Sequence, residues 1–109
     1  MISVRDYLTV DNVSPFTRWF ATLNTRAALK VRTAVARMEG GNLSNTKSVG
    51  AGVLECRIDF GPGYRVYFGR DGRSLVILLG GETKKRQRND IAAARGLWTD
   101  YKARKRREK

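Results

Sequence analysis

The sequence contains no histidine and a single cysteine, Cys56. Without histidine, the chain cannot build a serine triad of the usual kind or the common zinc sites, and one cysteine cannot replace them. A lone cysteine also excludes an internal disulfide, so a reducing cytoplasm is the expected location. Cys56 falls in an apolar row and is expected to pack there as an inert side chain.

Long hydrophobic runs and acidic residues are also scarce. No apolar run reaches the roughly 18 residues that a membrane span needs, and residues 1–6 lack the apolar core of a signal peptide. Ten acidic residues stand against 22 lysines and arginines, which gives a net charge of +12 and a pI of about 10.7. This imbalance implies a polyanionic partner, with RNA or DNA first and an anionic membrane second. A length of 109 residues suits one compact domain.

The first half of the chain predicts one strand and two helices. Residues 2–9 alternate well enough for a strand. Ser14 and Pro15 indicate a helix start, and the helix that follows buries an aromatic stripe at helical spacing. A second helix begins after Asn24 and ends at Gly40. The expected inner positions of the two helices are Phe16, Trp19, Phe20 and Leu23, then Val31, Ala34, Val35 and Met38.

The second half predicts three antiparallel strands and a last helix. Residues 42–52 are expected to form a loop, two strands flank the Gly61-Pro62-Gly63 turn, and residues 74–79 form a central strand that ends at Gly80-Gly81. A final helix should begin between residues 83 and 87 and bury Ile91, Ala94, Leu97, Trp98 and Tyr101. The fold class is therefore α+β, with an N-terminal strand and a helical hairpin packed on a small antiparallel sheet. We expect one domain over residues 1–101 and a basic tail over 102–109.

The hairpin from Glu55 to Phe68 carries the most informative pattern. Because side chains alternate along a strand, Cys56 and its apolar neighbours take one face. Arg57, Arg65 and Tyr67 are then expected together on the polar face. Two guanidinium groups and a phenol there could hold phosphate. The alternative is an ordinary solvated sheet face.

Other basic residues gather in two places. Arg26, Lys30 and Arg37 should form a ridge on the second helix. Lys84 follows the central strand at once, where the sheet can fix its position, and Lys85 and Arg86 come next. A basic C-terminal third favours binding to a phosphate backbone, although residues 102–109 could equally form a frayed, solvated tail. Its basic residues are Lys84, Lys85, Arg86, Arg88, Arg95, Lys102, Arg104, Lys105, Arg106, Arg107 and Lys109.

In order and spacing, several short motifs resemble those of the RelE/HigB-like toxins of bacterial toxin–antitoxin modules, in the branch called addiction module killer proteins. They are Gly41-Asn-Leu, Lys47-Ser-Val-Gly-Ala-Gly, Glu55-Cys-Arg57, Gly61-Pro-Gly-Tyr-Arg-Val-Tyr-Phe68 and Leu78-Leu-Gly-Gly, with Lys84, Gln87 and Asp90-Ile91 downstream. The resemblance implies the small fold shared by the RelE and ParE toxins, a helical hairpin on an antiparallel sheet.

The resemblance also implies ribosome-dependent cleavage of mRNA without metal or cofactor. In that chemistry the ribose 2′-OH attacks the adjacent phosphorus and leaves a 2′,3′-cyclic phosphate. Arg65 matches the phosphate-binding arginine of the family, and Arg57 should lie beside it. Lys47 and Lys84 match basic positions that stabilise charge or transfer a proton. Tyr67 could stack on a base, and the general acid and base stay unassigned.

A toxin of this kind implies a cognate antitoxin encoded next to it, expected to be a helix-turn-helix protein. The other partners implied are the ribosome and mRNA, with no membrane. Two alternatives stay open: a ParE-like DNA gyrase inhibitor of the same fold, and a non-catalytic basic domain that binds nucleic acid. Fold does not separate them, because function lies in the site carried by the fold.

Overall fold

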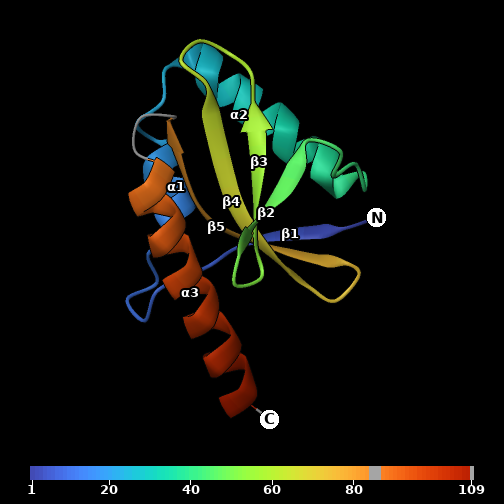
Figure 1. Cartoon of the computed structure of the whole chain (residues 1–109), viewed down its shortest axis with the longest axis vertical. Helices are drawn as coiled ribbons and strands as arrows, with labels where there is room; N and C mark the ends of the chain where they lie inside the picture. Colours follow the sequence, from blue (N-terminus) through green and yellow to red (C-terminus); the bar gives the residue numbers. More distant parts are fainter. Residues whose placement is uncertain (84–86, 109) are drawn as a thin grey trace.

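The computed structural model describes residues 1–83 and 87–108, in which five strands form one sheet and three helices cover its two faces (Figure 1). The strands lie in the order β1-β5-β4-β3-β2. The fold is therefore α+β, as the sequence predicts. In chain order the elements are β1 (Ser3–Asp6), α1 (Pro15–Phe20), α2 (Thr25–Glu39), β2 (Thr46–Gly50), β3 (Val53–Ile58), β4 (Tyr64–Asp71), β5 (Leu75–Thr83) and α3 (Gln87–Arg107).

Side-chain caps begin both helices of the N-terminal hairpin. The Ser14 hydroxyl accepts a hydrogen bond from the backbone N–H of Thr17 (3.0 Å), and the Asn24 side chain accepts one from that of Ala27 (2.9 Å). Such caps satisfy N–H groups that have no partner within the helix. Ser14 also donates to Asp6 Oδ2 (2.7 Å), which ties the start of α1 to β1. The predicted starts of both helices are thus confirmed.

Each face of the sheet is covered by its own layer of apolar side chains. On one face, α1 and α2 contribute Phe16, Val31 and Met38 to a core that contains the Cys56 row of the hairpin. On the other face, α3 contributes Ala94 and Trp98. The central strand β5 serves both layers, since Val76 and Leu78 join the first core and Ile77 and Leu79 the second. This two-sided burial confirms the prediction made from its unbroken apolar run.

The sheet is mixed rather than antiparallel, which corrects the prediction. β1 runs parallel to β5, with Ser3 opposite Leu75 and Asp6 opposite Leu78. A parallel pair needs a long crossover connection, and the whole chain between the two strands supplies it. The two strands lie side by side in Figure 1 although they come from opposite ends of the chain.

The predicted loop over residues 42–52 is also wrong, because β2 occupies Thr46–Gly50. This stretch is poor in the residues that favour strands, and its antiparallel pairing with β3 supplies the hydrogen bonds instead. As an edge strand it is short and interrupted by a register shift between Ser48 and Gly50. The extra strand brings Lys47 opposite Glu55.

The strand β5 continues to Thr83 through the glycine pair that was expected to end it. Tyr67 pairs with Gly80 and Phe68 with Leu78, so an extra residue forms a bulge on β5. Gly81 lies so close to the indole of Trp19 that a Cβ there would come within 2.2 Å of the ring. The glycine therefore allows close approach of a helix rather than marking the end of a strand.

The helix α3 runs through the predicted boundary at residue 101 without a break. Tyr7 donates a hydrogen bond to Asp100 Oδ2 (2.6 Å), Arg104 Nε lies 2.8 Å from the same oxygen, and Lys105 pairs with Asp71. Residues 102–107 are thus helical, and two of their cations bind carboxylates, so this stretch is not a frayed tail. None of the helices in the described ranges combines the length and apolar character that a bilayer crossing needs.

Candidate active site

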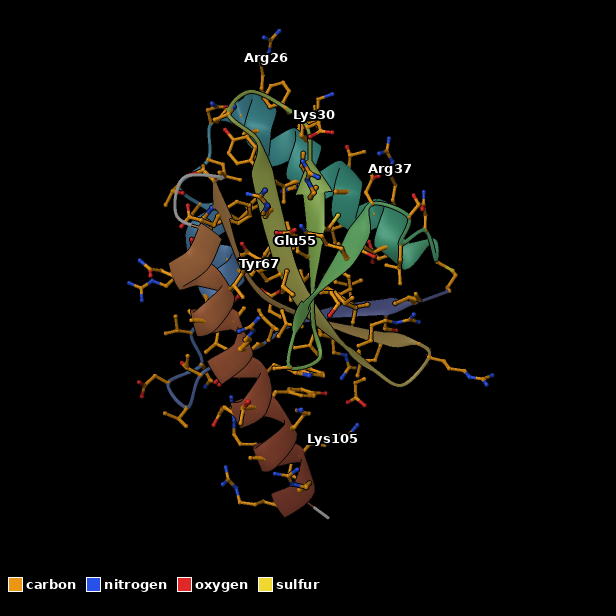
Figure 2. All side chains as sticks on the ribbon, in the orientation of Figure 1. Arg26, Lys30, Arg37, Glu55, Tyr67 and Lys105 are labelled. Atoms are coloured by element: carbon orange, nitrogen blue, oxygen red, sulfur yellow. The ribbon has the colours of Figure 1, made fainter. Side chains whose placement is uncertain are left out.

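A row of three polar side chains crosses the sheet on the face that α3 covers. Lys47 on β2 lies opposite Glu55 on β3, and Glu55 lies opposite Tyr67 on β4. Figure 2 shows Glu55 and Tyr67 near the middle of the molecule, between the helical layers. Glu55 is fully buried and Tyr67 is 1% exposed. The alternative of an ordinary solvated sheet face is therefore wrong at this point, where a polar cluster lies beneath a helix.

The buried carboxylate of Glu55 is held between two cations. Arg65 Nε lies 2.8 Å from Glu55 Oε1, and Lys47 Nζ lies 3.5 Å from Oε2. The Arg65 contact has the distance of an ion pair but not the angle of a well-directed hydrogen bond, so its attraction is electrostatic. A buried charge is tolerated only when it is paired. Glu55 therefore fixes the guanidinium of Arg65 in place.

A second row contains the two arginines of the hairpin. Arg57 lies directly opposite Arg65, and Arg65 lies opposite Glu82 on β5. The prediction that the arginines stand side by side is confirmed. Arg57 is exposed, whereas Arg65 is only 7% exposed.

Both arginines line one cleft of about 210 Å³ beside the Gly61-Pro62-Gly63 turn. Like charges directly opposite each other destabilise a strand pair. Glu55 offsets the charge of Arg65, and an anion in the cleft would offset that of Arg57. Arginine is also the side chain best shaped to bind phosphate. Asp59 also lines the cleft, so its charged lining is two arginines and one carboxylate, a balance that still favours an anion such as phosphate.

The structure corrects the role expected for Tyr67. Its side chain lies under α3 in the same cluster as Trp98 and Ala94, so it cannot stack on a base. Burial, with a smaller contribution from the charge of Glu55, raises the pKa of Tyr67 to about 12, while Arg65 acts in the opposite direction. Tyr67 is therefore a neutral phenol at physiological pH and does not serve as a base there.

No protein-family model matches the chain. A protein of Haemophilus influenzae, described as an uncharacterized protein, is 40% identical over 97 residues, which is 88% of this chain and 92% of the relative. The two chains belong to one family. Because the match spans most of both chains, the family is defined by the whole domain and not by a shared motif. The relative's description names no activity, so the case for function depends on the geometry of the site.

The three cations that were predicted to form a ridge on α2 fall into two groups. Arg26, Lys30 and Arg37 are all exposed along α2, as Figure 2 shows, with Arg26 at the N-terminal end of the helix. Lys30 and Arg37 line a groove of about 360 Å³ between α2 and the strands β2 and β3, together with Arg57. Arg26 does not line it. The predicted ridge is therefore divided, and two of its three members face the sheet edge.

The remaining predicted residues, Lys84, Lys85 and Arg86, lie outside the described residues. Within the described ranges, no three or more acidic, cysteine or histidine side chains gather as a metal site would require. Glu55 belongs to the Glu55-Cys-Arg57 motif, but the sequence predicted no role for it. The apolar stripe of the last helix was the signal in the sequence that Glu55 is buried. That stripe must cover a sheet face, and Glu55 lies on the face that it covers.

The raised pKa of Tyr67 predicts a loss of stability at high pH. An unfolded tyrosine has a pKa near 10, so between about pH 10 and 12 the folded protein binds more protons at this site than the unfolded chain. The contribution of Tyr67 is thus fully present below pH 10 and is lost as pH rises toward 12. Thermal melting from pH 8 to 11.5 should show a fall in Tm that is smaller in Tyr67→Phe. Identical alkaline slopes would contradict this.

Proposed function

We propose that this chain is the toxin of a toxin–antitoxin module, a ribosome-dependent endoribonuclease of the RelE type. The observation that carries the proposal is the pair Arg57 and Arg65, which line one cleft with Glu55 holding the second arginine from behind. The α+β fold, with a helical hairpin on one sheet face and a C-terminal helix on the other, is compatible with the fold that the resemblance implies, although β1 pairs in parallel with β5. The net charge of +12 suits a ribosomal target.

In the proposed reaction, the ribose 2′-oxygen attacks the adjacent phosphorus and the bond from phosphorus to the 5′-oxygen breaks. The products are a 2′,3′-cyclic phosphate and a 5′-OH. Charge accumulates on the non-bridging oxygens in the transition state, where fixed cations lower the barrier most. Arg65 is held by Glu55, so it is preorganised for this task. Arg57, which is exposed, binds the same phosphate from the solvent side.

Two proton transfers complete the reaction, one from the 2′-OH and one to the 5′-oxygen. Lys47 is the described candidate, because its side chain is 58% exposed and its ammonium lies 3.5 Å from Glu55, next to the arginine row. Lys84 is the second candidate by resemblance. Glu55 is fully buried and does not reach substrate, so it acts as a positioning residue for Arg65 and Lys47.

The proposal includes an antitoxin as partner, a helix-turn-helix protein encoded next to the toxin and acting in the cytoplasm. Charge complementarity between an acidic antitoxin segment and this basic protein would speed capture. The ribosome and mRNA are the other partners.

The test compares the wild type with Arg57→Ala, with Arg70→Ala as the matched control. Arg57 and Arg70 are both exposed strand arginines, but only Arg57 lines the cleft. We expect the wild type to arrest growth and to create new mRNA 5′ ends inside translated codons, mapped by primer extension. Arg57→Ala should cut about ten to a hundred times more slowly, since a charged hydrogen bond is worth about 1.5–3 kcal/mol. Arg70→Ala should cut as the wild type does.

Two other outcomes would reject the nuclease. Growth arrest with intact mRNA and blocked DNA supercoiling would assign the chain to the ParE-like gyrase inhibitors instead. No arrest in any form, together with RNA binding by the purified protein, would indicate a non-catalytic basic domain.

A further inference from the structure

A groove on the described surface lies between α2 and the open end of the β2–β3 pair. Its volume is about 360 Å³, and Lys30 and Arg37 line it from the helix. Asn45, Arg57 and Asp59 line it from the sheet side, with Cys56 also on its wall. Figure 2 shows Lys30 and Arg37 on α2, beside the upper strands.

The groove exists because β3 extends past the start of its partner β2. Pairing begins with Thr46 opposite Cys56, and the N–H of Arg57 donates to the carbonyl of Asn45 (3.1 Å). Beyond this point β2 no longer covers the edge of β3. Ile58 and Asp59 therefore border an open space below α2.

Local contacts hold the two α2 cations over this space. Lys30 Nζ lies 5.6 Å from the centroid of the Phe60 ring, a cation–π contact that anchors it at the hairpin end. The carbonyl of Arg37 accepts a hydrogen bond from the N–H of Asn42 (2.9 Å), which fixes the end of the helix. Arg37 and Cys56 line the same groove; burial raises the pKa of the Cys56 thiol, and the positive charge of Arg37 acts in the opposite direction.

The charge of the lining favours an anionic ligand. Lys30, Arg37 and Arg57 supply three positive charges, and Asp59 supplies one negative charge. Amide and hydroxyl side chains make up most of the rest, which suits a hydrogen-bonding ligand better than an apolar one. The groove and the cleft that contains Arg65 meet along Arg57, Ile58 and Asp59, which line both.

We propose that the groove binds the phosphodiester backbone of single-stranded RNA that continues from the cleft. This inference rests on the proposed function, since it places the scissile phosphate at Arg57 and Arg65 and the neighbouring nucleotides along α2. Lys30 and Arg37 are seven positions apart, about 10 Å along a helix. Single-stranded RNA that follows the groove over this length would pass both cations. The groove thus determines how much flanking RNA is held, not which phosphate is cut.

The test measures binding of a single-stranded RNA 12-mer whose riboses are 2′-O-methylated and cannot be cut. Fluorescence anisotropy is recorded over a range of salt concentrations. For Lys30→Ala/Arg37→Ala we expect about tenfold weaker binding at low salt. The slope of log affinity against log salt should fall by about 1.4, or 0.7 for each lost phosphate contact. A 12-mer should also bind the wild type more tightly than a trimer, and this gain should disappear in the variant.

The matched control is Arg18→Ala/Arg32→Ala, which removes the same charge from α1 and α2. Both arginines are exposed, and neither lines the groove. This variant should bind within about twofold of the wild type with the same salt slope. Equal losses in the two variants would show that only net charge matters and would overturn the groove. A groove variant that binds RNA normally but loses affinity for poly-glutamate would overturn it in favour of an acidic protein partner.

The 2′-O-methylated RNA reports binding alone, because it cannot be cleaved. A failure of the groove proposal can therefore be told apart from a failure of the nuclease proposal. If the wild type cuts no mRNA in cells while the groove variant loses slope and affinity, the groove is supported and the nuclease is rejected. If the wild type cuts mRNA and the groove variant binds normally, the nuclease is supported and the groove is rejected. Melting curves of the two variants should stay close to that of the wild type, since the four substituted side chains are exposed. Each variant loses one cation–π contact, Lys30 with Phe60 or Arg32 with Phe20, worth about 0.5–1 kcal/mol at an exposed site.

Discussion

Replacing Arg65 by alanine is expected to lower the free energy of unfolding by about 3–5 kcal/mol. Arg65 Nε lies 2.8 Å from a carboxylate of Glu55 that is fully buried, and the alanine removes that cation. Lys47 is farther away, at 3.5 Å, and half-exposed, so it compensates weakly. Urea unfolding followed by circular dichroism measures the change.

A matched pair of variants separates the buried charge from a general loss of arginine. Arg70→Ala removes an exposed arginine from the same strand and should cost no more than about 1 kcal/mol, the worth of its exposed hydrogen bond to the Arg73 carbonyl. The double variant Glu55→Leu/Arg65→Met should recover most of the stability that Arg65→Ala loses, because apolar side chains can replace a buried ion pair. A loss below 1 kcal/mol in Arg65→Ala would mean that the pair contributes little to the fold. Arg65→Ala is therefore a poor choice for testing catalysis, and the exposed Arg57 is the better one.

Replacing Trp98 by alanine is expected to cost about 3–5 kcal/mol, the usual cost of removing a large core aromatic. Trp98 is 5% exposed, its ring stacks on Tyr101 at 5.1 Å between centroids, and it joins α3 to the sheet face that contains Tyr67. The loss should appear as a lower urea midpoint. It should also increase the accessibility of the Tyr67 phenol, measured by tyrosine absorbance at alkaline pH.

The contact between Trp98 and Gly69 offers a sharper form of this test. A Cβ at Gly69 would lie 2.5 Å from the indole ring, so Gly69→Ala should cost about 1–3 kcal/mol in the wild type. In the Trp98→Ala background the same substitution should cost almost nothing, because the ring is gone. Double-mutant analysis therefore predicts a coupling of at least 1 kcal/mol. Additive losses would show that the ring moves aside freely.

Alternation along the strands predicted the hairpin well, because a period of two assigns every side chain to a face regardless of context. The pairing of Arg57 with Arg65 and the Cys56 row followed directly from it. The caps at Ser14 and Asn24 were equally predictable, since their chemistry is local. The strand β2 was not, because Thr46–Gly50 has little strand propensity and forms only where β3 offers an edge.

The sequence predicted burial less well than it predicted the faces of the strands, and the residues affected belong to the candidate site. Alternation shows that Glu55 and Tyr67 share a face, but not whether α3 covers that face. The helix α3 can dock because Gly69 leaves room for the ring of Trp98, and these two residues are far apart in the chain. The groove beside α2 has the same origin, since it arises from the offset between the ends of two strands.

The parallel pairing of β1 with β5 also has a consequence for synthesis. Ser3 cannot pair until Leu75 has been synthesised, about 70 residues later. At a translation rate of about 5–20 residues per second, this delay is about 4–14 s. The β2, β3 and β4 strands can pair locally during this time, but β4 has no β5 beside it, and the face destined for α3 is uncovered. Non-local pairing of this kind also slows folding after release. Each new copy is therefore expected to pass through several seconds in which the first strand has no partner and the sheet is incomplete.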